Sequence, residues 1–221
     1  MGTRGIAGFR VDEQDKIHYI QFDSYPGGVG LDVFKIVHST SDKELVAMAR
    51  RVTMISGKRK PSQKQIEHCL SFTGLADLGV SEQSVNDWYC LLRRAQGRLE
   101  WYKKNETVEQ EIYAKSGSNR VIVKHNTGNE PLKYMLDGGD FPASSLFCEW
   151  GWIINVDAKI LECYKGFNEN PNASGRYAHL QKKPGDKHYG ISFIAGIVFE
   201  EARRMSDDEF LALFKNEEED E

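Results

Sequence analysis

The chain has 221 residues, of which 40% are hydrophobic and 28% are charged, and its formal net charge is -4. These proportions are typical of a soluble globular protein, and the negative charge argues against a general nucleic-acid-binding protein. No run of about 18 apolar residues occurs and no signal-like apolar segment follows Met1, so we expect a cytoplasmic protein with no membrane association.

Length and composition predict one domain with a single sizeable core, because no Pro/Gly/Ser-rich linker divides the chain. We place this domain at residues 1–215 and predict a disordered acidic tail at 216–221. Four cysteines without C-x-x-C spacing are expected to be reduced and buried: Cys69, Cys90, Cys148 and Cys163. His179 and His188 lack the spacing of metal ligands, so we predict no metal site and no cofactor.

Two strand-like runs, 3–11 and 16–23, predict an N-terminal hairpin closed by the polar turn 12–15. A symmetric turn would place Arg4 opposite Asp23 at the open end of the hairpin. This pair is either a plain cross-strand ion pair, which stabilises by about 0.2–1 kcal/mol, or the polar start of a functional site.

The segment SYPGGVG at 24–30 leads directly into an apolar-periodic helix at 31–37. Glycines before a helix let the backbone approach a ligand, and the free N–H groups of the first turn can hold an anion. The spacing matches neither G-x-G-x-x-G nor a Walker loop. The candidate ligand-binding residues of this segment are Tyr25, Gly27, Gly28 and Gly30.

The middle of the chain predicts helices at 42–55 and 61–72, the first of which begins with the capping-box residues Ser41 and Glu44. The three cations at 58–60 form either a solvated charge cluster or a phosphate-binding surface.

The stretch 78–97 predicts a helix with a capping box at Ser84 and Asp87 and a terminating glycine, Gly97. Its apolar stripe should be buried and comprises Trp88, Leu91, Leu92 and Ala95. A different face either lines a cleft or faces water, and it carries Tyr89, Arg93 and Gln96.

The central stretch 137–167 carries the strongest strand signal. The even-numbered residues from Leu146 to Val156 are all apolar, which predicts a strand buried on one face, and 160–167 predicts the returning strand of a hairpin. Glu149 interrupts the opposite face. A carboxylate there is either a solvated rim residue or a cleft residue paired with an arginine.

The remaining stretches are more polar. We predict a charged helix at 98–115, a surface insertion at 116–130 and a long loop at 168–186, in which Arg176 is a candidate for the wall of a site. A last strand at 189–199 and a capped helix at 206–215 complete the chain. Strand pairs at both ends with helices between them predict an α+β fold with a mixed or mostly antiparallel sheet.

Four motifs together resemble a family of small proteins encoded mainly by bacteriophages of actinobacteria: MGTRG at 1–5, DSYPGGVG at 23–30, DWYC at 87–90 and SLFCEW at 145–150. The resemblance spans nearly the whole chain but brings no established activity. The chain departs from the family pattern at the insertion 116–130 and at Trp152, where a tyrosine is usual. The resemblance implies a phage-type intracellular protein that modifies or inhibits a host component.

Two functional hypotheses follow, and a structural protein of the virion is a third. The first is an accessory protein that binds a small anionic ligand, such as a nucleotide, or a host protein. Its cleft would contain Arg4, Asp23, the loop 27–30, Arg93, Glu149 and Arg176.

The alternative is a hydrolase or group transferase, in which Asp23 or Glu149 acts as general acid or base and the arginines stabilise charge. An N-terminal-nucleophile-like arrangement is a variant of it, although Gly2 has no side-chain nucleophile and Thr3 would need a further cleavage to become terminal.

Overall fold

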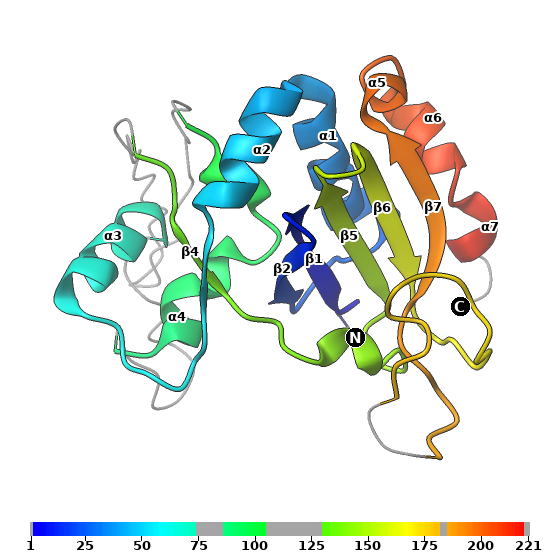
Figure 1. Ribbon diagram of the computed structural model, residues 1–221, viewed down its shortest axis with the longest axis horizontal. Helices are drawn as coiled ribbons and strands as arrows, with labels where there is room; N and C mark the ends of the chain where they lie inside the picture. The colour runs from blue at the N-terminus through cyan, green and yellow to red at the C-terminus, as the bar shows by residue number, and fades with distance from the viewer. Residues whose placement is uncertain (1, 74–85, 105–129, 182–184, 219–221) are drawn as a thin grey trace, which may run out of the picture.

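The computed structural model describes residues 2–73, 86–104, 130–181 and 185–218 (Figure 1). A five-stranded sheet in the order β2-β1-β5-β6-β7 forms its centre. Its strands are β1 (Gly5–Val11), β2 (Gln14–Ile20), β5 (Trp150–Asn155), β6 (Ile160–Lys165) and β7 (Ser192–Val198). Only β1 and β5 run parallel within this sheet. A second, parallel pair joins β3 (Thr53–Ile55) to β4 (Tyr134–Leu136). The predicted α+β fold with a mostly antiparallel sheet is therefore confirmed.

Helices lie beyond both edges of the main sheet. The α-helices are α1 (Leu31–Ser39), α2 (Asp42–Arg51), α3 (Gln63–Thr73), α4 (Trp88–Leu92), α5 (Phe199–Ala202), α6 (Asp207–Ala212) and α7 (Lys215–Glu218). Shorter turns are η1 (Pro26–Gly30), η2 (Arg93–Ala95), η3 (Leu99–Tyr102) and η4 (Phe141–Ala143). In Figure 1, α3, α4 and β4 lie beyond the edge strand β2, whereas α5, α6 and α7 lie beside β7.

The two faces of the main sheet are packed differently. On the face that meets α1 and α6, the rings of Trp150 and Trp152 stack at 5.7 Å, and Phe210 and Phe214 pack against Trp152. The opposite face carries a smaller apolar cluster, which comprises Ile6, Ile17, Cys148, Ile153, Tyr164, Tyr177 and Ile191. The prediction that the central hairpin forms the core is confirmed, and all four cysteines are buried and free.

The turn of the N-terminal hairpin differs from the prediction. Asp12 and Glu13 both have positive φ, 51° and 61°, so a two-residue turn replaces the expected four-residue turn and pairs Phe9 with Lys16. The carboxylate of Asp157 accepts the backbone N–H groups of Asp12 and Glu13 at 3.0 and 2.9 Å. A contact this distant in sequence stabilises a turn that lacks the usual Asn-Gly or Asp-Gly signature.

Several predicted boundaries also shift. The helix expected to reach 55 ends at Arg51, because the N–H of Thr53 donates to the Lys133 carbonyl at 2.7 Å and the chain becomes β3. The central strand begins at Trp150 rather than at 146. Asp87 caps α4 by accepting the N–H of Cys90, Ser84 lies outside the described residues, and the predicted apolar stripe is buried as expected.

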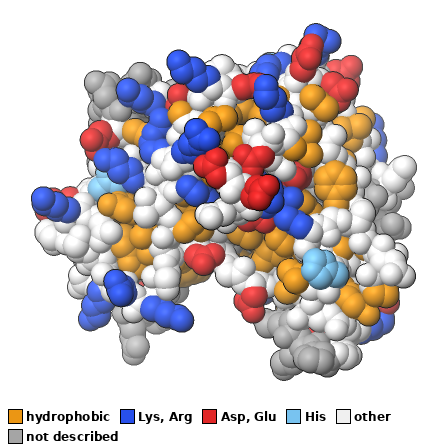
Figure 2. Space-filling view, in the orientation of Figure 1, with side chains coloured by type: hydrophobic (Ala, Val, Ile, Leu, Met, Phe, Trp, Pro, Cys, Tyr) orange, Lys and Arg blue, Asp and Glu red, His pale blue; other side chains and the backbone are white. Residues whose placement is uncertain are grey.

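Two further predictions lie partly outside the described residues. Of the helix expected at 98–115, the structure describes only the 3-10 turn η3, and most of the insertion 116–130 is not described. Helix α7 continues to Glu218, three residues past the predicted end of the domain at 215. On the face in Figure 2, basic and acidic side chains are interspersed, with acidic groups near its centre.

Candidate ligand-binding cleft at the sheet edge

A wide concave site lies where the edge strand β2 ends. The segment 93–98 crosses this edge, and the N–H of Gly97 donates to Nε2 of His18 at 2.9 Å, which fixes the segment against β2. Between this segment and the start of α1 lies a cleft of about 520 Å³. Its charged, polar and aromatic lining residues include Phe22, Asp23, Tyr25, Asp32, Arg93, Arg94, Gln96 and Arg98.

The charged groups of this cleft are only partly paired. Arg94 donates to the Thr73 carbonyl at 3.2 Å, and Arg98 lies 3.7 Å from the carboxylate of Glu100. Within the described part of the chain, the side chains of Arg93 and Asp23 make no hydrogen bond or ion pair. An unpaired guanidinium at a concave surface has its donors available for a ligand.

The backbone around Asp23 is held in place by the core below it. Asp23 has a positive φ of 58°, a conformation that aspartate tolerates better than most residues. Its carbonyl accepts the N–H of Val29 at 2.8 Å, and the carbonyl of Ser24 accepts the indole N–H of Trp152 at 2.6 Å. The cleft therefore rests on the tryptophan-centred core.

The glycine loop has a packing role that the sequence did not indicate. The N–H groups of Gly28, Val29 and Gly30 already donate to the carbonyls of Tyr25 and Asp23, so they are not free to hold an anion. A Cβ on Gly30 would lie 2.5 Å from the Trp152 ring, and one on Gly28 would lie 2.2 Å from the Asp23 carbonyl oxygen.

Among the candidates of this loop, Tyr25 and Gly28 line the cleft, whereas Gly27 and Gly30 are not part of its lining.

A small cavity of about 40 Å³ adjoins the cleft, and Gln96 lines both. Tyr89 and His18 also line this cavity. Of the predicted face, Tyr89 therefore lines the cavity, Arg93 lines the cleft and Gln96 lines both. Burial lowers the pKa of His18 to about 4. The imidazole is then neutral at pH 7, and because Nε2 accepts a hydrogen bond, we assign its proton to Nδ1.

Arg4 and Glu149 lie together but outside the lining of the cleft. The backbone N–H of Arg4 donates to Oε1 of Glu149 at 3.1 Å, and the Arg4 guanidinium lies 5.0 Å from the centre of the Phe147 ring. Among the described residues, Arg4 and Asp23 form no ion pair.

Strand β1 separates β2, which precedes Asp23, from β5, which follows Glu149. The structure places Asp23, but not Glu149, in the lining of this cleft, so the two candidate catalytic carboxylates do not share it.

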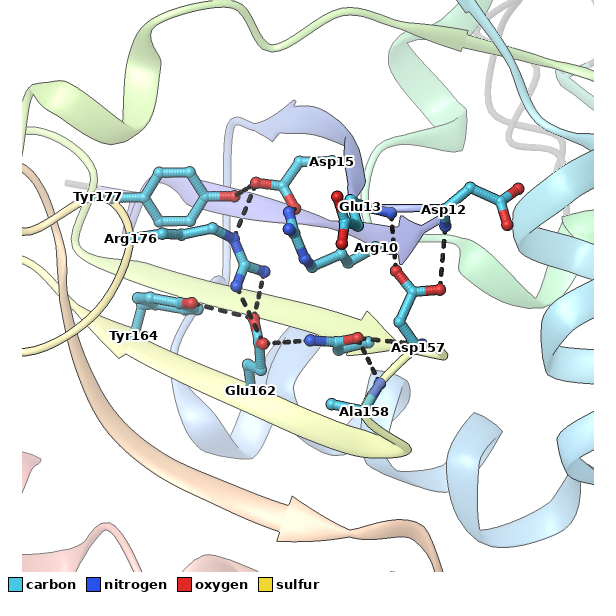
Figure 3. Close-up of polar contacts among 11 residues, drawn as sticks. Arg10, Asp12, Glu13, Asp15, Asp157, Ala158, Glu162, Tyr164, Arg176 and Tyr177 are labelled. Carbon is cyan, nitrogen blue, oxygen red and sulfur yellow. Dashed lines mark hydrogen bonds and ion pairs between the residues drawn. The ribbon is translucent and has the colours of Figure 1, made fainter.

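Arg176 lies at a third location, on the face of the main sheet that carries the smaller apolar cluster with Tyr164 and Tyr177 (Figure 3). Its Nε lies 2.9 Å from Asp15 and its Nη1 donates to Glu162 at 3.0 Å, while its Nη2 forms a second contact with Glu162. Tyr164 and Asn155 also donate to Glu162, at 3.0 and 2.6 Å. The expected place of Arg176 in the cleft is therefore wrong, because this guanidinium pairs with Asp15 and Glu162 and is not part of the cleft lining.

The residues missed by the sequence argument are Asp15 and Glu162. The side chain of Glu162 is only 5% exposed although it is a carboxylate. Burial lowers the pKa of Arg176, but the hydrogen bond to Glu162 and the neighbouring Tyr164 and Tyr177 raise it above its ordinary value overall. A glutamate in the middle of a predicted strand was the available signal, because such a group must be paired when buried.

Comparison of the chain with protein-family models, with curated proteins and with solved structures finds no match in any of the three. No helix in the described ranges is long and apolar enough to cross a membrane. The described residues also contain no cluster of three or more His, Cys, Asp or Glu side chains that could hold a metal ion.

Proposed function

We propose that this chain is a phage-type intracellular accessory protein that binds a small anionic ligand, such as a nucleotide, in the cleft at the end of β2. The observation that carries the proposal is Arg93, which has no side-chain partner among the described residues and lines a cleft of about 520 Å³ together with Arg94 and Arg98. Guanidinium groups bind phosphate and carboxylate with paired hydrogen bonds, and the cleft has the volume of a small-molecule site.

Two exposed aromatic residues in the lining favour a ligand with a planar group. Phe22 is 53% exposed and Tyr25 is 39% exposed, although large hydrophobic side chains in this protein are mostly buried. Aromatic rings stack on planar ligand groups and contribute about 1–3 kcal/mol when they stack on a base. Arginines beside such rings would receive the anionic part of a nucleotide while a ring contacts its base.

Isothermal titration calorimetry with inorganic phosphate, AMP and ATP tests the proposal. We expect measurable binding of at least one of these probes and a loss of about tenfold or more in affinity in Arg93→Gln, since a charge-assisted hydrogen bond is removed. Arg204→Gln is the matched control, because Arg204 is a surface arginine that pairs with Glu200 outside the cleft lining. Absence of binding, or equal affinity in both variants, would contradict the proposal.

Binding of a host protein is a second candidate, favoured by three exposed hydrophobic residues near the start of β5 and the end of β6. Leu146, Phe147 and Phe167 are 45, 44 and 43% exposed, and the N–H of Phe167 donates to the carbonyl of Ser145 beside the first two.

Native mass spectra of the protein purified from an actinobacterial host separate the two candidates. A small adduct lost in Arg93→Gln supports the anionic ligand, whereas a co-purified protein lost in Phe147→Ser supports the host partner.

A further inference from the structure

A second hollow continues the cleft along α1. It has a volume of about 230 Å³, and it shares Asp32 and Arg98 with the cleft. Lys35 and Lys103 line its far part. Because two residues line both hollows, the second hollow adjoins the cleft, and we call the two together the groove.

Basic side chains predominate along this groove although the chain has a net charge of -4. The basic lining residues are Lys35, Arg93, Arg94, Arg98 and Lys103, and the acidic ones are Asp23, Asp32 and Glu100. A local excess of basic groups on an acidic protein marks a surface that favours anions.

The ion pairs already present in the second hollow are weak competitors for a ligand. Lys35 pairs with Asp207 at 3.1 Å, but both side chains are more than half exposed. The Arg98 side chain is 56% exposed and its contact with Glu100 is long, at 3.7 Å. Exposed pairs of this kind contribute at most about 1 kcal/mol, so a multiply charged anion can displace them.

We infer that the ligand is a nucleoside polyphosphate, whose phosphate chain runs from Arg93 past Arg98 toward Lys35. This inference rests on the proposed function and extends it from a single anionic group to a chain of phosphates. A monophosphate would leave the basic residues of the second hollow without a role. The acidic groups fit the same ligand, because polyphosphates carry Mg²⁺, which proteins bind through one or two carboxylates and the phosphates themselves.

The test is an affinity series with AMP, ADP and ATP in buffer containing Mg²⁺. We expect ATP to bind at least about tenfold more tightly than AMP, as the added phosphates gain charge-assisted contacts. In Lys35→Gln and in Arg98→Gln this ratio should fall below about threefold, whereas Arg204→Gln should keep it. Thermal unfolding of each variant checks that the fold is retained, and replacing these exposed side chains should change stability by no more than about 0.5 kcal/mol.

The outcomes separate this inference from the proposed function. If AMP binds in an Arg93-dependent way but ATP binds no more tightly, the polyphosphate inference is overturned and the proposed function stands. A gain from AMP to ATP that survives both Lys35→Gln and Arg98→Gln also overturns it, because the second hollow then does not hold the phosphates. If no nucleotide or phosphate binds, both are wrong.

Discussion

Arg176 and Arg93 were equivalent candidates in the sequence, yet the structure places them in opposite electrostatic situations. Arg176 lies on the packed face of the main sheet, where Asp15 and Glu162 engage its guanidinium. Arg93 lines an open cleft and has no partner among the described residues. A paired arginine on a packed face has its charge compensated by protein carboxylates, whereas an unpaired arginine in a cleft keeps all of its donors for a ligand.

The difference between these two regions can be measured on one scale, the free energy of unfolding. Groups in the sheet-face network should contribute strongly to stability and nothing to binding. Cleft groups should do the reverse, because their interactions are completed only by a ligand.

The largest expected effect is at Glu162, whose side chain is 5% exposed. Glu162→Gln removes one of the two carboxylates that face Arg176, and we expect a loss of about 1.5–3 kcal/mol, because hydrogen bonds to charged groups contribute this much while Asp15 still pairs with the guanidinium. Urea denaturation measures this loss. The double variant Glu162→Leu/Arg176→Met should recover a large part of this loss. A loss below about 1 kcal/mol in the single variant would show that the network does not contribute strongly to stability.

Gly30 tests whether the glycine loop serves packing. Gly30→Ala would place a Cβ 2.5 Å from the Trp152 ring, and overpacking of this kind costs about 1–3 kcal/mol. Gly27→Ala is the matched control, because its Cβ would meet its nearest atom at 3.6 Å and should change stability by less than about 0.5 kcal/mol. Equal stabilities of the two variants, measured by thermal unfolding, would show that close contact with Trp152 is not the reason for glycine at 30.

His18 predicts a pH dependence of stability. Burial lowers its pKa from 6.5 to about 4, so the unfolded chain binds a proton below pH 6.5 that the folded protein does not bind until about pH 4. Stability therefore falls as the pH falls through this window, by about 2 kcal/mol between pH 7 and pH 5.

Denaturation curves at both pH values measure this effect. His18→Gln, which keeps an acceptor for the N–H of Gly97, should lose most of this pH dependence, and His38→Gln at an exposed position serves as the control. A pH dependence as steep in His18→Gln as in the wild type would rule out His18 as its source.

The smallest effect on stability is expected at Arg93. Arg93→Gln should change the free energy of unfolding by less than about 0.5 kcal/mol, because no protein partner is lost. Combined with a loss of ligand affinity, this result would show that Arg93 serves binding whereas Glu162 serves stability. A loss of stability comparable to that of Glu162→Gln would show that the cleft is part of the packing instead.

Local patterns in the sequence were sufficient to predict the buried strands and helices of the fold. The alternation through Trp150, Trp152 and Ile154 predicted the central strand, because period-two burial leaves a direct signature in the order of residues. The stripe of α4 was predicted for the same reason. The candidates Asp23, Tyr25, Arg93 and Gln96 do line one cleft, since they flank turns and helix starts at one edge of the sheet.

Contacts between distant segments decided the features that local patterns did not predict, such as the turn of the N-terminal hairpin. The two-residue turn at Asp12 and Glu13 is held by Asp157, and a pairing across such a sequence separation leaves no local pattern.

The sequence by itself therefore determined the α+β class, the central hairpin and the buried stripe of α4, because these follow from periodicity. Only the tertiary structure separated Glu149 and Arg176 from the cleft, because pairing of a charged side chain depends on which distant residue lies beside it.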